Sequence, residues 1–184
     1  MPHSKQLLKE VISEGDIVVD ATMGNGNDTI FLAQAVGPTG KVYAFDIQQQ
    51  ALEATQVRLG DLYSRTELIL DSHTRIKDYV PEGITAAVFN LGFLPNQHET
   101  AVITQPDTTV QALEATLQVL KPGGMITIAV YDGHPGGVEE REAVLGFARK
   151  LHAKRYQVVR YEVVNQQNHP PFLLVIEKTS RPTT

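Results

Sequence analysis

The chain has 184 residues, 42% of them hydrophobic, which suits one domain with a single core over residues 1–180 and a loose tail at residues 181–184. It has no cysteine, so disulfides, thiolate zinc sites and cysteine nucleophiles are excluded. The net charge of −5 gives no general basic field, so binding to a polynucleotide would need a local basic patch.

The N-terminal segment does not have the apolar stretch of a signal peptide. Residues 4–13 instead show the apolar spacing of a short helix, and the longest apolar runs, such as residues 172–176, are only as long as a strand. We therefore expect a cytoplasmic protein that does not bind a membrane.

Apolar runs typical of strands alternate with segments of helical spacing along the chain. The expected strands are residues 17–21, 41–45, 66–70, 86–90, 125–131, 157–164 and 172–177, and the expected helices are residues 4–13, 28–36, 48–60, 74–79, 109–120 and 138–153. This alternation predicts a parallel sheet, and the short connection before the last strand makes that strand antiparallel. The predicted fold class is α/β, with a Rossmann-like, seven-stranded, mostly parallel sheet and helices on both faces.

A glycine turn follows the first strand and precedes a helix. Its polar and glycine residues are Asp20, Thr22, Gly24, Asn25, Gly26, Asn27 and Asp28. Backbone N–H groups and a helix dipole at such a turn can bind a carboxylate or a phosphate. Thr29 stands where a dinucleotide fingerprint has its third glycine, and Asp20 would repel a pyrophosphate. We expect Asp20 to hold an ammonium group instead, directly or through water.

The second strand ends at an acidic residue. Asp46, followed by Ile47 and Gln48, is placed where a carboxylate can accept hydrogen bonds from both hydroxyls of a ribose. S-adenosylmethionine carries an ammonium, a carboxylate and a ribose together, and it is the cofactor that this combination favours. A plain strand–turn–helix crossover is the alternative.

The third strand is followed by Asp71, Ser72 and His73. We expect these residues to line the cofactor pocket, with Asp71 on the adenine side. A helix N-cap explains the same segment, and both interpretations hold if Ser72 caps the helix while Asp71 binds the cofactor.

The fourth strand ends at Asn90, whose amide offers an acceptor and two donors where cofactor and substrate should meet. We predict that Asn90 contacts both. Phe93 and Pro95 follow in the longest non-periodic connection, residues 92–108, and we expect them to bind substrate, with Phe93 stacking on a base. A turn that uses asparagine and glycine for their backbone conformation is the alternative.

The fifth strand is preceded by Lys-Pro-Gly-Gly at residues 121–124, where glycine is expected to cap a helix. After this strand come Tyr131 and His134. His134 is the best candidate for a general base because histidine titrates near neutrality, although an exposed turn histidine is the alternative. Asn165 and Asn168, before the last strand, could read base edges or belong to a plain loop. His3, His98 and His152 have no metal-ligand spacing with carboxylates, so we predict no metal.

Several strings together resemble one bacterial family, which was long labelled rRNA methylase. They are residues 20–29, 46–48, 72–73, 90–95, 131–137 and 165–168 with the prolines at 170 and 171. Its members methylate 5-aminomethyl-(2-thio)uridine at the wobble position of tRNA. Residues 96–100 depart from the family pattern, in which glycines, an acidic residue and a lysine follow the leucine–proline pair.

The resemblance implies a class I methyltransferase fold, S-adenosylmethionine as cofactor, the tRNA anticodon region as partner and a homodimer. It implies direct methyl transfer to a neutral amine, with Asn90 positioning the amine, Tyr131 shaping the pocket and His134 or water taking the proton. Other substrates, such as rRNA or the oxygen or nitrogen of a small molecule, remain alternatives. So does a non-catalytic regulator that binds S-adenosylmethionine. A nicotinamide dehydrogenase is disfavoured by Thr29.

Overall fold

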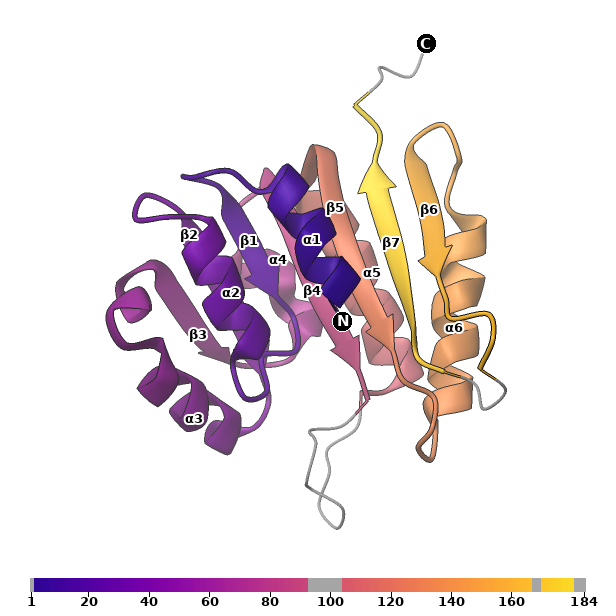
Figure 1. Ribbon diagram of the computed structural model, residues 1–184, viewed down its shortest axis with the longest axis horizontal. Helices are drawn as coiled ribbons and strands as arrows, with labels where there is room; N and C mark the ends of the chain where they lie inside the picture. Colours follow the sequence, from indigo (N-terminus) through magenta and orange to yellow (C-terminus); the bar gives the residue numbers. More distant parts are fainter. Residues whose placement is uncertain (1, 93–103, 167–169, 181–184) are drawn as a thin grey trace.

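Seven strands form one sheet in the order β3-β2-β1-β4-β5-β7-β6 in the computed structural model, which describes residues 2–92, 104–166 and 170–180 (Figure 1). The strands are β1 (Ile17–Asp20), β2 (Lys41–Asp46), β3 (Thr66–Leu70), β4 (Ile84–Leu91), β5 (Leu120–Val130), β6 (Tyr156–Tyr161) and β7 (Phe172–Lys178). The helices are α1 (Pro2–Val11), α2 (Asn27–Ala35), α3 (Gln49–Leu59), α4 (Ile76–Tyr79), α5 (Pro106–Val119) and α6 (Gly137–Lys150), with short 3-10 helices η1 (Gly60–Arg65) and η2 (His73–Arg75).

The strand directions confirm the predicted fold class. The pairs among β1 to β5 are parallel, whereas β7 runs antiparallel to both β5 and β6. The central strand β4 is buried along nearly its whole length, as expected for a parallel strand that is covered on both faces.

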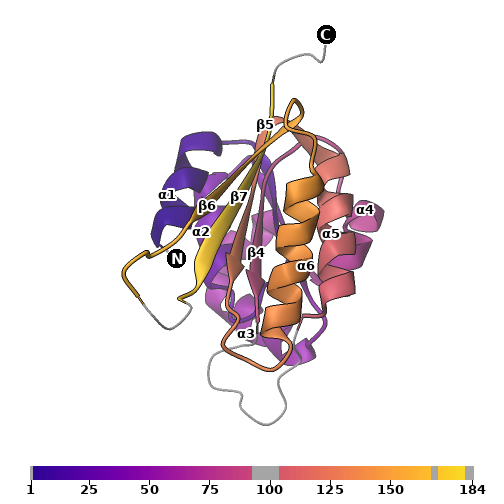
Figure 2. The same ribbon diagram turned by 90° about the vertical axis from the view of Figure 1, so that its right-hand side faces the viewer.

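Helices cover both faces of the sheet (Figure 2). On one face, α1, α2 and α3 bury an apolar cluster that includes Leu8, Leu32 and Val42. On the other face, α4, α5 and α6 bury a larger cluster that includes Phe89 and Leu113. Each such side chain contributes roughly 1.5–3 kcal/mol when it is fully buried. Among the described residues, no helix is long and apolar enough to cross a membrane.

The chain order of the sheet reverses between β1 and β4, which lie side by side. In open α/β sheets, ligands bind at such a point, outside the carboxyl ends of the strands. The strands that end around this point are β1 at Asp20, β2 at Asp46, β4 at Leu91 and β5 at Val130. The fold therefore brings the predicted site residues after these strands to one edge of the sheet.

The prediction for residues 121–124 was wrong, because this segment does not cap a helix. Helix α5 ends at Val119, and the segment lies within β5. The register of β4 with β5 shifts between Ile84 and Ala86, which pair with Leu120 and Met125, and Gly123 supplies a left-handed residue in this irregular stretch with φ of 77°. Glycine and proline signal an irregular backbone in both situations, so the sequence alone did not separate them.

Two glycines with the same backbone angle give a matched test of the site's packing. Gly26 and Gly123 both have φ of 77°, so alanine at either position costs about 1–2 kcal/mol in backbone strain. At Gly26 the new Cβ would also lie 2.7 Å from Thr55, whereas at Gly123 it would meet nothing within 4 Å. We expect Gly26→Ala to lower the free energy of unfolding by at least about 1 kcal/mol more than Gly123→Ala in urea titrations. Equal losses would contradict this packing.

Candidate active site

The glycine turn between β1 and α2 is fixed by its neighbours. Gly24 and Gly26 adopt left-handed backbone angles, with φ of 51° and 77°. Asp46 Oδ2 at the end of β2 accepts the Gly24 N–H at 2.9 Å, and Thr55 Oγ1 of α3 donates to the Gly24 carbonyl at 3.1 Å. Because α2 begins directly after Gly26, its first N–H groups, which have no partner within the helix, face the turn.

Arg58 of α3 holds the outer side of this turn. Its guanidinium donates to the Asn25 carbonyl and, at 2.8 Å, to Asn27 Oδ1. Both acceptors belong to the predicted cofactor segment, but Arg58 was not predicted as part of the site. Its partners lie 33 and 31 positions away, so no local sequence signal could have revealed them.

Asp20 lies beneath the turn rather than at its surface. Its side chain is fully buried, and its oxygens accept hydrogen bonds from Thr29 Oγ1 at 2.7 Å and the Thr22 N–H at 3.2 Å. Burial, together with the negative charges of Asp28 and Asp46, raises the pKa of Asp20 to about 7. Asp20 therefore supports the turn, and the accessible carboxylates of this region are those of Asp28 and Asp46.

Asp46 joins the glycine turn to the loop after β2. Its Oδ2 accepts from the Gly24 N–H, and its Oδ1 accepts from the Gln48 N–H, both at 2.9 Å. The adjacent Ile47 is 57% exposed although its side chain is large and apolar. A carboxylate in this fixed orientation beside an open apolar side chain fits the predicted ribose contact.

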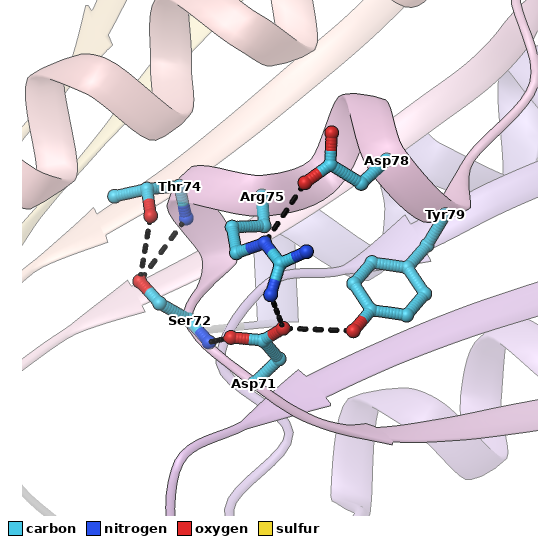
Figure 3. A network of polar contacts seen from close by, with 6 residues as sticks. All are labelled: Asp71, Ser72, Thr74, Arg75, Asp78 and Tyr79. Atoms are coloured by element: carbon cyan, nitrogen blue, oxygen red, sulfur yellow. Dashed lines mark hydrogen bonds and ion pairs between the residues drawn. The ribbon is translucent and has the colours of Figure 1, made fainter.

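The residues after β3 form a polar network (Figure 3). Asp71 Oδ2 accepts from Arg75 and from the Tyr79 hydroxyl, at 2.8 and 2.7 Å, and its Oδ1 accepts the Ser72 N–H at 2.8 Å. These hydrogen bonds, led by that of Tyr79, lower the pKa of Asp71. Ser72 caps η2 by accepting the Thr74 N–H, which confirms the predicted N-cap. The adenine contact of Asp71 stays a prediction.

His73 connects this network to β1. Its Nδ1 lies 3.1 Å from the Ala21 carbonyl, and its ring packs 6.0 Å from the ring of Phe89. Burial lowers the pKa of His73, so the ring is neutral at pH 7. Because a carbonyl only accepts, Nδ1 carries the proton. His73 therefore links the segment after β3 to the residue that follows β1 and packs on Phe89 of β4.

Asn90 lies where β1, β4 and α2 meet. Its N–H donates to Thr22 Oγ1 at 2.7 Å, and its Nδ2 donates to Asp28 Oδ2 at 2.8 Å. Asp28 also forms an ion pair with Lys5 of α1 at 3.4 Å, and Lys5 was not predicted as a site residue. Burial raises the pKa of Tyr131, and the charge of Asp28 raises it further, so Tyr131 carries a neutral phenol in the same region.

His134 is buried in the loop after β5, with only 9% of its surface exposed. Its Nδ1 lies 3.0 Å from the Pro135 carbonyl, so Nδ1 donates and Nε2 is the atom that could accept a proton. A Cβ placed on Gly92 would lie 3.4 Å from that Nε2. The ring therefore packs against the backbone two residues after Asn90. This burial argues against the alternative interpretation of His134 as an exposed histidine in a turn.

Glu140 of α6 is a buried carboxylate behind this loop. It accepts hydrogen bonds from Thr109 at 2.6 Å and from Thr104 at 2.8 Å, and Thr104 Oγ1 in turn accepts the Gly92 N–H at 3.3 Å. Burial raises the pKa of Glu140. Glu140 therefore ties the ends of the segment that joins β4 to α5.

Four predicted substrate contacts lie after β4 and β6. Asn165 is exposed and follows β6, whose end pairs with the start of β7 beside the carboxyl end of β5. Phe93, Pro95 and Asn168 lie outside the described residues, as does the divergent segment at residues 96–100. Within the part of the chain that the structure describes, no group of three or more histidine, aspartate or glutamate side chains could hold a metal ion.

The burial of Asp20 predicts a pH-dependent stability. A carboxyl whose pKa is raised from 3.8 to about 7 holds its proton better in the folded state, so its contribution destabilises the fold increasingly as pH rises through this interval. Asp20→Asn resembles the protonated acid and does not titrate. We expect the variant to gain on the order of 3 kcal/mol relative to the wild type between about pH 4 and pH 8 in urea unfolding. A constant difference between the two proteins would show that the pKa of Asp20 is not raised.

Comparisons with known proteins show similarity to methyltransferases in sequence and in fold. The model of a family described as "Putative rRNA methylase" matches residues 42–177. A chloroplastic tRNA (mnm(5)s(2)U34)-methyltransferase of Arabidopsis thaliana is 37% identical over 92% of this chain, which spans 66% of the length of that relative.

Two solved structures match nearly the whole chain. A putative rRNA methylase from Clostridium thermocellum has a TM-score of 0.93 at 44% identity, and a putative methyltransferase from Streptococcus mutans in complex with SAH has a TM-score of 0.87 at 46% identity. Each match covers 96% of both chains. Since the family model covers most of the sequence and the fold agrees throughout, this chain belongs to the "putative rRNA methylase" family of S-adenosylmethionine-dependent methyltransferases.

Proposed function

We propose that this protein methylates the exocyclic amine of 5-aminomethyl-(2-thio)uridine at the wobble position of tRNA, with S-adenosylmethionine as methyl donor. The observation that carries the proposal is the 37% identity, over 92% of the chain, to a relative named for the wobble uridine of tRNA. The polar cluster of Asn90, Asp28 and Tyr131 supports it, because an amine needs acceptors around it when it is aligned with a methyl donor.

The residues of the glycine turn fit the cofactor. The start of α2 offers N–H groups to a carboxylate, and Asp46 offers a fixed carboxylate to ribose hydroxyls. We expect Asp71 to contact the adenine. When bound, S-adenosylmethionine supplies a methyl group on a sulfonium, which is already activated for direct transfer.

The protein's own groups must then align the amine and keep it neutral. Since Nδ2 of Asn90 donates to Asp28, the amide oxygen of Asn90 is the atom that can accept an N–H from the amine. Tyr131 would form a wall of the pocket. The proton released by the amine would leave to water or to Nε2 of His134.

A second candidate substrate is rRNA, which the description of the matching family favours. The tRNA anticodon region as partner, the homodimer and the cytoplasmic location remain predictions. The partner and the homodimer follow from the resemblance.

Nucleoside mass spectrometry tests the substrate. Purified protein is incubated with S-adenosylmethionine and tRNA that carries 5-aminomethyl-modified wobble uridine, and the digested nucleosides are analysed. We expect the aminomethyl nucleoside to gain one methyl group, while tRNA without the aminomethyl group gains none. Methylation of rRNA in a parallel reaction, with none on the tRNA, would overturn the proposal in favour of the second candidate.

Asp46→Ala tests the cofactor site. Loss of this carboxylate removes the ribose acceptor and the partners of the Gly24 and Gln48 N–H groups. We expect S-adenosylhomocysteine to bind at least about tenfold more weakly in isothermal titration calorimetry. Asp61→Ala is the matched control, because Asp61 is an exposed aspartate of η1, at the opposite edge of the sheet. Equal affinities for both variants would mean that Asp46 does not hold the cofactor.

A further inference from the structure

The carboxylate of Asp28 stands apart from the other acidic groups near the site. Asp20 is fully buried, and Asp46 accepts two backbone N–H groups. Asp132 forms an ion pair with Arg141, and Glu140 accepts two threonine hydroxyls. Asp28 instead contacts the amide of Asn90 and the ammonium of Lys5, and 24% of its side chain is exposed.

The contact with Asn90 fixes the orientation of the amide. A carboxylate only accepts hydrogen bonds, so the amide nitrogen must face Asp28 and the amide oxygen must face away from it. The two side chains therefore present two acceptors side by side, the amide oxygen of Asn90 and the carboxylate of Asp28. Tyr131 borders the same space. It is 40% exposed, and its pKa is raised by burial and by the nearby charge of Asp28.

The contact with Lys5 indicates what kind of group the Asp28 carboxylate can bind. Lys5 carries a primary alkylammonium, and its Nζ lies 3.4 Å from Asp28 Oδ1. A protonated aminomethyl group is also a primary alkylammonium. Because the Lys5 side chain is 40% exposed, the ion pair is weak and can be exchanged for a ligand at small cost.

We propose that Asp28, together with Asn90, binds the nitrogen of the substrate's aminomethyl group, with the substrate replacing Lys5 at the carboxylate. This inference rests on the proposed function and assigns Asp28 to the substrate rather than to the cofactor. The substrate binds as a primary ammonium and first loses a proton to water or to Nε2 of His134, which frees the nitrogen lone pair. During transfer, this lone pair forms the new N–C bond, the C–S bond breaks and its electron pair stays on sulfur. The products are S-adenosylhomocysteine and a secondary ammonium, which then loses a proton to water.

The charge on the nitrogen explains why a carboxylate is needed. A neutral amine becomes positively charged as the methyl group arrives, and a fixed negative group beside it stabilises that developing charge. The same group favours an amine over a hydroxyl of the nucleoside, because a neutral hydroxyl donates a weaker hydrogen bond than an ammonium. Asp28 would thus contribute both to the rate and to the choice of nucleophile.

Equilibrium binding in the presence of S-adenosylhomocysteine tests the proposal without turnover. The affinities for tRNA with and without the wobble aminomethyl group are compared for the wild type, Asp28→Asn and Asp28→Glu. We expect about a tenfold preference for aminomethyl tRNA in the wild type, no preference in Asp28→Asn and a partly restored preference in Asp28→Glu. The asparagine variant can still accept from Asn90, so the local hydrogen bond is kept. An undiminished preference in Asp28→Asn would overturn the proposal.

Single-turnover methylation and cofactor titration complete the test. In Asp28→Asn we expect about a hundredfold slower transfer at saturating cofactor, with the affinity for S-adenosylhomocysteine changed by less than about threefold. Asp61→Asn makes the same chemical change at an exposed position and should leave both quantities unaltered. A loss of cofactor affinity with an unchanged rate would instead assign Asp28 to the cofactor. A wild type that methylates no aminomethyl tRNA would refute the proposed function itself, separately from the role of Asp28.

Discussion

The repulsion among three carboxylates is the constraint around which this site is built. Asp20, Asp28 and Asp46 surround one glycine turn, and burial together with the charges of the latter two raises the pKa of Asp20. Each is accommodated differently. Asp20 is buried and accepts two hydrogen bonds, whereas Asp46 accepts two backbone N–H groups. Asp28 lies in the first turn of α2, where the helix dipole favours negative charge. The turn can therefore remain negative and still be well ordered.

A chain of short-range contacts connects this turn to the rest of the edge. Thr22 accepts the backbone N–H of Asn90 and so joins the first strand to the fourth at the point where the sheet order reverses. Two residues further on, Gly92 is bonded to Thr104, which donates to the buried Glu140. Packing on both faces of the sheet holds these strand ends in place, so the geometry of the site is a property of the whole domain.

Local patterns in the sequence were sufficient for the sheet and for the main polar residues. Buried strands appear in the sequence as continuous apolar runs. Parallel strands bring the residues that follow them to one edge of the sheet, which is why Asp20, Asp46 and Asn90 could be grouped.

The contacts of Lys5 and Arg58 could not be predicted, because they join segments distant in sequence. The irregular strand pairing around Gly123 was missed because glycine and proline also end helices. Pro106 starts α5 earlier than predicted, although proline at a first helical position is a known signal.

The two ends of the domain differ in their distance from the chemistry. Because β7 runs antiparallel to β5, Glu177 pairs with Met125, near the amino ends of the parallel strands, and the chain leaves the sheet on the side away from the cofactor turn (Figure 1). Helix α1, in contrast, brings Lys5 to Asp28. An affinity tag or fusion partner joined before α1 would thus sit beside the substrate edge, where it can obstruct a large RNA. One joined after β7 would leave that edge open for immobilised binding assays.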